Sequence, residues 1–214
     1  MAQVLCFGDS ITQGYVDPEG GGWTQRLRRR LDQEATFPLG GVAFPAHATF
    51  NLGVSDDTSD RLLARLEGEA RARLLGDQTV LVIAVGINET AFDLASGRPA
   101  HSLEGFAERL AALVATARTI TDQVLLVGLL PVDEARMQPA PWSVDGESYA
   151  NDRIAAFNRV VRRVAADHGV AMVDCFDEVL AGDHAALLHD GLHPNAAGHQ
   201  LLADRIGEAV GRWL

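Results

Sequence analysis

The chain has 214 residues, 47% of them hydrophobic and 22% charged, which is the composition of one globular domain with a sizeable core. Its formal net charge of −11 is spread along the sequence and disfavours nucleic acid and anionic membranes as partners, because both require a basic patch. No apolar run approaches the ~20 residues of a membrane-spanning helix, so we expect no membrane span.

Two further features bear on location and partners. The first strand-like run begins almost at Met1, and no basic segment followed by an apolar stretch and a cleavage site precedes it, so we expect a cytoplasmic protein. The basic residues near Arg26 and Arg71 follow helical patterns and are interpreted as solvated helix faces. Cys6 and Cys175 lie in or just after apolar runs, which favours buried thiols over a disulfide.

Strand-like and helix-like segments alternate along the chain. Short apolar runs predict five buried strands, at about residues 4–7, 48–52, 79–85, 124–128 and 170–174. Helical spacing of apolar residues predicts helices at about 23–34, 59–74, 102–119, 148–168, 176–180 and 195–213. Two Pro-containing segments follow neither period: we expect a plain loop at 37–47, and a lid or binding loop at 131–146.

This alternation predicts one α/β domain over residues 1–214, with a parallel sheet between two layers of helices. Right-handed crossovers bring all strand-to-helix loops to one edge of such a sheet. Residues with a chemical role should therefore follow the strands, or lie in the loop before the last helix.

Ser10 follows the first strand at this edge. A serine after a strand is commonly a helix cap or turn residue, and at the carboxyl edge of a parallel sheet it is also a candidate nucleophile. Only other parts of the chain distinguish these roles.

The loop before the last helix contains Asp190 and His193, three residues apart. A histidine that acts as a base needs a carboxylate on its Nδ1–H, and one turn of chain can bring these two side chains together. A polar helix-entry loop is the alternative, with Asn195 as the cap. A metal site is a further alternative, but the irregular spacing of the nearby histidines does not favour one; these histidines are His184, His189, His193 and His199.

Two other strand ends supply groups that can stabilise an oxyanion. Asn51-Leu52-Gly53 ends the second strand with a glycine, whose backbone N–H a ligand can approach closely. Gly86-Ile87-Asn88-Glu89 ends the third with an asparagine, whose side-chain amide is a hydrogen-bond donor.

Together, four blocks resemble the signature of the GDSL/SGNH hydrolases, in the same order and over nearly the whole chain. They are Gly8-Asp9-Ser10-Ile11-Thr12, Gly53 after Asn51, Gly86-x-Asn88-Glu89 and Asp190-x-x-His193-Pro194. The resemblance implies a flavodoxin-like strand order, 2-1-3-4-5, and ester hydrolysis without a cofactor.

By resemblance, Ser10 is the nucleophile, His193 the base and Asp190 its orienting carboxylate. The Ser10 and Gly53 N–H groups and the Asn88 side chain would form the oxyanion hole. Asp9 is then expected to be structural, holding the turn, since Asp190 fills the acid role. Two departures from the family pattern are Asp56, where a further glycine is common, and Glu89, where aspartate is more common.

The implied strand order also separates the cysteines. The first and fifth strands would be three spacings apart, roughly 14 Å at ~4.8 Å each. A disulfide requires Cα atoms within about 7 Å, so we expect Cys6 and Cys175 to be free.

We expect a serine esterase for small or medium acyl groups, acting on a small-molecule ester. Candidate pocket residues are apolar or aromatic side chains near the predicted site: Phe44, Pro45, Phe92, Met137, Trp142 and Tyr149. A carbohydrate O-acetyl esterase, an acyl thioesterase and an acyltransferase are alternatives on the same site. A non-catalytic binding module is disfavoured, because a binder has no need of a nucleophile, a base and oxyanion donors together.

Overall fold

A computed structural model describes residues 2–76, 78–144 and 146–214. Its central sheet has five parallel strands in the order β4-β1-β5-β8-β10, which is the predicted order 2-1-3-4-5. These strands are β1 (Ala2–Gly8), β4 (His47–Gly53), β5 (Gln78–Ala84), β8 (Val124–Val127) and β10 (Ala171–Val173). Gly8 is level with Gly53 on one side and Ala84 on the other, so the three strands end together at the carboxyl edge.

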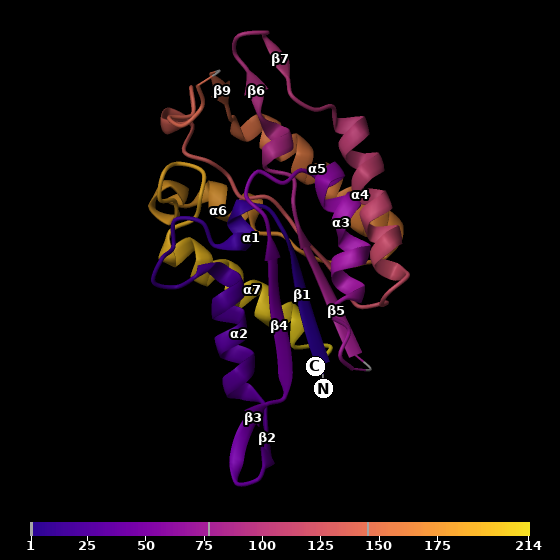
Figure 1. The fold of residues 1–214 in the computed structure, drawn as a ribbon. Helices are drawn as coiled ribbons and strands as arrows, with labels where there is room; N and C mark the ends of the chain where they lie inside the picture. The colour runs from indigo at the N-terminus through magenta and orange to yellow at the C-terminus, as the bar shows by residue number, and fades with distance from the viewer. Residues whose placement is uncertain (1, 77, 145) are drawn as a thin grey trace.

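Helices cover both faces of the sheet (Figure 1). One face packs against α2 (Gly22–Glu34) and α7 (Ala196–Val210), and the other against α3 (Ser59–Arg71), α4 (Leu103–Arg118) and α5 (Asn151–His168). Successive residues of a strand point to opposite faces.

Accordingly, Val4 and Cys6 of β1 join the core under α2 and α7, whereas Leu5 and Phe7 join the core on the other face. All four side chains are fully buried, as expected for a central parallel strand.

Side-chain caps fix two of the predicted helix starts. Asn195 accepts hydrogen bonds from the N–H groups of Ala197 and Gly198 at the start of α7, and Ser102 accepts one from Gly105 at the start of α4. Two short helices complete the set, α1 (Ser10–Gln13) directly after β1 and α6 (Phe176–Ala181) after β10.

The segment expected to be a plain loop at 37–47 is instead mostly a β-hairpin, so that prediction is wrong. Strands β2 (Thr36–Leu39) and β3 (Val42–Pro45) pair antiparallel and project from the end of the molecule opposite α1 (Figure 1). Its prolines are tolerated because a two-stranded hairpin leaves outward-facing positions that need no donor.

A second small sheet lies near the carboxyl edge. Strand β6 (Phe92–Asp93) pairs antiparallel with β7 (Arg98–Pro99) and with β9 (Glu147–Ser148). It joins the segment after β5 to the segment after β8, at the top of Figure 1. The predicted helix at 148–168 therefore begins later, at Asn151, because the preceding residues extend along β6.

Two other expectations concern cysteines and membrane spans. Cys6 and Cys175 are both buried and free, as predicted. Within the described ranges, no helix combines the length and the apolar character needed to cross a membrane.

Candidate active site

Ser10 is placed by the tight junction between β1 and α1. Asp9 caps α1, its Oδ1 accepting the Ile11 N–H at 3.0 Å, and Ser10 is the first helical residue. The junction depends on Gly8, since a Cβ there would lie 2.2 Å from both the Ala84 carbonyl oxygen and Thr12 Oγ1. Ser10 is thereby held at the carboxyl edge with its side chain facing the loop before α7.

That loop brings a histidine and a carboxylate to Ser10. His193 Nε2 lies 3.0 Å from Ser10 Oγ, and His193 Nδ1 lies 2.7 Å from Asp190 Oδ2. With Nδ1–H donating to Asp190, Nε2 is left to accept the Ser10 hydroxyl proton. The sequence-predicted group of three residues is therefore one continuous hydrogen-bonded chain.

Asp190 is built to stay ionised. Burial acts to raise its pKa, but hydrogen bonds from the His193 ring and from the backbone N–H groups of His193 and Leu192 outweigh burial and lower the pKa to about 2. Asp190 Oδ1 accepts both backbone bonds, at 2.8 and 3.0 Å. One carboxylate thus organises the loop with one oxygen and orients the imidazole with the other.

The backbone around this loop is fixed on both sides. The His189 N–H donates to the His193 carbonyl at 2.8 Å, and the Asn195 N–H donates to the Leu187 carbonyl at 2.9 Å. Gly191 has a φ of +108°, in the region that favours glycine, and its carbonyl accepts the Asp133 N–H at 2.8 Å. The turn between Asp190 and His193 is consequently closed and anchored to the segment after β8.

The structure does not support Gly53 as an oxyanion donor, so that prediction is wrong. Its N–H donates to Asn51 Oδ1 at 3.0 Å. A Cβ at Gly53 would lie 2.2 Å from the Gln13 nitrogen, so this glycine serves the close approach of β4 to α1. Asn51 Nδ2 strengthens the same junction by donating to Thr24 and Gln13.

Asp56, three residues further along the chain, carries a backbone N–H that differs from that of Gly53. It has a φ of +65°, lines the same cavity as Ser10, and its N–H has no hydrogen-bond acceptor within the part of the chain that the structure describes. Aspartate is one of the few non-glycine residues that adopts this conformation readily. The departure at position 56 from the glycine that the family pattern implies is therefore compatible with the backbone there.

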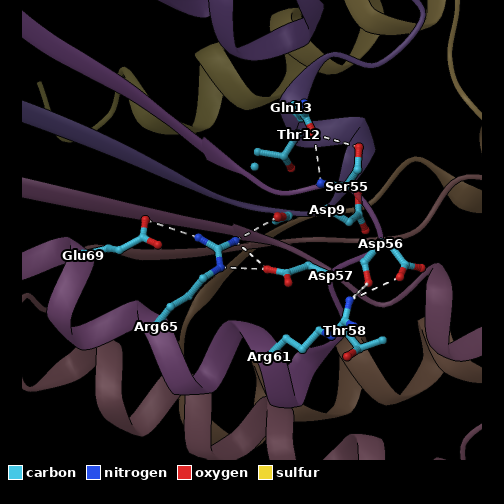
Figure 2. Close-up of polar contacts among 12 residues, drawn as sticks. Asp9, Thr12, Gln13, Ser55, Asp56, Asp57, Thr58, Arg61, Arg65 and Glu69 are labelled. Carbon is cyan, nitrogen blue, oxygen red and sulfur yellow. Dashed lines mark hydrogen bonds and ion pairs between the residues drawn. The ribbon is translucent and has the colours of Figure 1, made fainter.

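The loop that carries Asp56 is fastened at several points (Figure 2). Gln13 Oε1 accepts the Ser55 N–H at 2.9 Å, Arg61 contacts Asp56 Oδ2 at 3.2 Å, and Arg65 pairs with the buried Asp57 at 2.6 Å. These contacts preorganise the backbone at Asp56.

Asn88 approaches the cavity from the next strand end. Its Nδ2 donates to the Asp57 carbonyl at 2.8 Å, which leaves the second amide hydrogen for a ligand. The following residue, Glu89, is fully buried and its Oε1 accepts the Ser59 N–H at the start of α3. The departure from aspartate at position 89 therefore serves packing between the two loops.

Ser10, Asp56 and Asn88 all border one cavity of about 460 Å³. Of the predicted pocket residues, Trp142 and Tyr149 line it. Trp142 is 43% exposed, and its ring centroid lies 5.6 Å from that of His193.

The other predicted pocket residues are elsewhere. Phe44 stacks on Phe37 in the hairpin, and Pro45 borders a separate depression with Arg28 and Asp32. Met137 is fully buried in the core beneath Gly191. Phe92 lies in β6 and does not line the cavity.

Comparison with known proteins identifies the family. The model of the GDSL-like lipase/acylhydrolase family matches residues 6–201. The chain belongs to this family. It is therefore a hydrolase that acts on ester bonds.

Individual relatives have names consistent with this. The chain is 28% identical to esterase TesA of Pseudomonas aeruginosa, over 95% of this chain and 85% of that protein. It is 27% identical to an acetylxylan esterase of Geobacillus stearothermophilus, over 98% and 94% of the two chains. A lipase/acylhydrolase structure from Enterococcus faecalis shares the fold, with a TM-score of 0.75 at 24% identity and coverage of 100% and 98%.

Several cavity residues of this family member were not predicted. Tyr15 and Val16 come from the turn after α1, Glu147 from β9, and His189 from the loop before α7. The Tyr15 ring centroid lies 4.9 Å from that of His193. The signal available for Tyr15 was its position only five residues after Ser10 in the first block, but aromatic side chains near a motif are as often core residues.

The turn that carries Tyr15 and Val16 is held by a buried ion pair. Asp17 pairs with Arg26 of α2 and accepts the Gly22 N–H at 2.9 Å. Burial acts to raise the pKa of Asp17, but its bonds to Arg26 and Gly22 lower it overall. Val16 adopts a φ of +58° within this turn, which shows how tightly the segment is constrained.

Asp9 contrasts with Asp190 in its electrostatics. It is 2% exposed, and burial raises its pKa to about 7, against the lowering effect of the Ile11 N–H and with smaller contributions from Glu89 and Asp57. Its role is to cap α1 behind Ser10, as predicted from the turn.

Both ring nitrogens of His193 are occupied by Ser10 and Asp190, which leaves neither for a metal. Among the described residues, no three side chains of the His, Cys, Asp and Glu types gather as a metal site.

Proposed function

We propose that this GDSL hydrolase cleaves its ester through an acyl-enzyme formed on Ser10. The observation that carries the proposal is the chain of hydrogen bonds from Ser10 Oγ to His193 Nε2, at 3.0 Å, and from His193 Nδ1 to Asp190, at 2.7 Å. It supplies a nucleophile, a base in the correct tautomer, and a carboxylate that stabilises the imidazolium formed during the reaction.

Acylation begins when His193 Nε2 takes the Ser10 proton as Oγ attacks the ester carbonyl carbon. The carbonyl π electrons move onto its oxygen and form a tetrahedral oxyanion. When that intermediate collapses, the carbon–oxygen bond to the alcohol breaks, and His193 returns the proton to the departing alcohol. Ser10 is left as an ester of the acyl group.

The oxyanion requires preorganised donors, and three line the cavity on different strand ends: the Ser10 N–H, the Asp56 N–H and the Asn88 side-chain amide. Asp56 replaces Gly53 in this role because the Gly53 N–H is already bonded to Asn51. The fastened loop in Figure 2 supports the assignment, since a donor held in place before substrate binds costs no reorganisation during the reaction.

Deacylation repeats the sequence with water. His193 removes a proton from water, the hydroxide attacks the acyl carbon, and Ser10 leaves with the proton that His193 returns. The cavity of about 460 Å³ suits esters of small or medium acyl groups.

A carbohydrate O-acetyl ester is the second candidate substrate. Trp142 is exposed beside His193, and a flat exposed aromatic ring is well suited to stack on a sugar. The relative from Geobacillus stearothermophilus is named an acetylxylan esterase, which supports the same candidate. Thioester hydrolysis and acyl transfer use the same acyl-enzyme and are separated from ester hydrolysis by their products.

The proposal is tested by labelling with a fluorophosphonate and by hydrolysis of p-nitrophenyl acetate. We expect wild type to be modified at Ser10, and Ser10→Ala to lose both labelling and several orders of magnitude in kcat while it unfolds at the same urea concentration. Labelling of another residue, or near-wild-type turnover by a folded Ser10→Ala variant, would contradict it. A competing alcohol in the assay reports acyl transfer as a second product.

A further inference from the structure

The cavity beside Ser10 is lined by acidic and aromatic side chains and, among the described residues, by no lysine or arginine. Its carboxylates are Asp56, Glu147 and Asp190, and its aromatic rings are Tyr15, Trp142 and Tyr149. Charge in an enclosed site acts on a substrate more strongly than the same charge on an open surface, because less water screens it. The balance of these charges therefore bears on which esters can enter.

Two of the three carboxylates already contact a partner side chain. Asp190 is bonded to His193 at 2.7 Å, and Asp56 is paired with Arg61 at 3.2 Å. Glu147 has no such partner: no cationic side chain lies within ion-pair distance of it among the described residues. Glu147 is the carboxylate in the cavity whose charge is left for a ligand.

The backbone of Glu147 is held at the edge of the cavity on both sides. Its N–H donates to Ser143 Oγ at 2.8 Å, its carbonyl accepts the Ala140 N–H at 2.8 Å, and β9 pairs it with Asp93 of β6. The Glu147 carboxylate acts on a neighbouring group in the cavity: burial raises the pKa of the Tyr149 hydroxyl, and Glu147, followed by Asp56 and Asp9, raises it further.

We propose that Glu147 selects substrates by charge, so that the enzyme takes neutral and cationic esters and rejects esters that carry an anionic group near the reacting bond. This inference rests on the proposed function, because it concerns the same cavity and the same reaction. A positive group can lie between the carboxylate and the exposed faces of Tyr15 and Trp142, which are favourable surfaces for a cation. An uncharged sugar acetate is admitted, whereas an ester with a carboxylate, sulfonate or phosphate close to the reacting bond is not.

The test compares three acetate esters of similar length. One is acetylcholine, the second is its neutral isostere with a tert-butyl group in place of trimethylammonium, and the third ends in a sulfonate. All three are assayed at about pH 8. We expect wild-type kcat/KM to fall about tenfold from cation to neutral and about tenfold again to anion, as for a charge some 6 Å away in a partly hydrated site. The ratios should shrink at high salt.

The variant Glu147→Gln keeps the size of the side chain and removes its charge. We expect the cation-to-anion ratio to fall at least tenfold in this variant. Glu104→Gln is the matched control, because Glu104 borders a separate depression with Arg159 and Arg163, and it should keep the wild-type ratio.

The outcomes separate the two proposals. A wild-type ratio near one, a ratio unaffected by salt, or a ratio that Glu147→Gln leaves unchanged overturns charge selection while hydrolysis of the neutral ester still supports the proposed function. Hydrolysis of none of the three esters, nor of p-nitrophenyl acetate, overturns the proposed function and charge selection with it.

Discussion

Two segments without helical or strand-like patterning were both expected to contribute to the substrate pocket, and only one does. The predicted loop at 131–146 brings Trp142 to the cavity, and the residues directly after it bring Glu147 and Tyr149. The segment around residues 36–45 forms a hairpin at the opposite end of the molecule, with Phe44 stacked on Phe37 at a centroid distance of 5.9 Å (Figure 1). Both segments contain prolines and aromatic residues, so these residue types do not separate them.

The difference is the direction of the neighbouring strand. In a parallel sheet, residues that follow a strand lie at the carboxyl edge, and residues that precede one lie at the amino edge. Residues 131–150 follow β8, whereas the hairpin precedes β4. Phe44 and Pro45 were therefore excluded from the pocket by the topology that the sequence itself implied. Aromatic residues should be considered for a site only after the edge on which they lie has been determined.

The largest expected difference between the two edges is in catalysis. Asp190→Asn at the carboxyl edge should lower kcat by roughly 10²–10⁴-fold, because asparagine can favour the wrong His193 tautomer and cannot stabilise the imidazolium. Asp32→Asn at the amino edge removes a carboxylate paired with Arg28 at 3.5 Å, and should leave kcat unchanged. Initial rates with p-nitrophenyl acetate measure both. Equal losses in the two variants would mean that the effect is one of folding or net charge.

Ionisation of the buried Asp9 carboxyl at the carboxyl edge should also lower the free energy of unfolding. The pKa of this carboxyl is about 7 in the folded protein and near 4 in an unfolded chain, so the folded state binds more protons between these values. The free energy of unfolding should therefore decrease as pH rises from about 4 to about 7, by an amount on the order of a few kcal/mol. Asn can still cap α1, so Asp9→Asn should remove this dependence.

Urea unfolding of wild type and Asp9→Asn, at about pH 5 and about pH 8, measures the effect. Subtracting the two proteins cancels other titrating groups, among them His199, whose burial lowers its pKa to about 4. The variant should gain stability relative to wild type at the higher pH. If the difference in free energy of unfolding between the two proteins does not change with pH, ionisation of the buried Asp9 does not destabilise the fold.

Much of the fold and the central chemistry could be predicted from the sequence, because both depend on order along the chain. The strand order follows from the resemblance and from the alternation of strands and helices. Ser10, Asp190 and His193 follow from residue type and spacing at positions that the topology brings to one edge, and the hydrogen-bonded chain between them agrees.

The predictions that were wrong or missing concern features that depend on local backbone conformation and side-chain packing. Gly53 and Asp56 are three residues apart, and only the structure shows that the Gly53 N–H is already bonded to Asn51. Met137 is fully buried beneath Gly191, which an apolar residue in a loop does not reveal. Glu147 lies at the cavity because β9 pairs with β6 over two residues. A strand this short leaves no recognisable pattern in the sequence.

The smallest expected effect returns to the two aromatic residues that were treated alike. Trp142→Ala should raise KM for a small ester by up to about tenfold, because it removes an exposed ring beside His193 that can contact bound substrate. Phe44→Ala removes a similarly exposed ring at the amino edge and should leave kcat and KM unchanged, with a loss of stability of about 1 kcal/mol or less from its contact with Phe37.

Steady-state kinetics and urea unfolding of both variants separate substrate contact from packing. If Phe44→Ala raised KM as much as Trp142→Ala, the hairpin would have to affect substrate binding at the opposite edge of the sheet. The assignment of roles by sheet edge would then fail. If neither variant changed KM, the edge assignment would still hold for catalysis through Asp190, but Trp142 would be reduced to a bystander at the rim of the cavity.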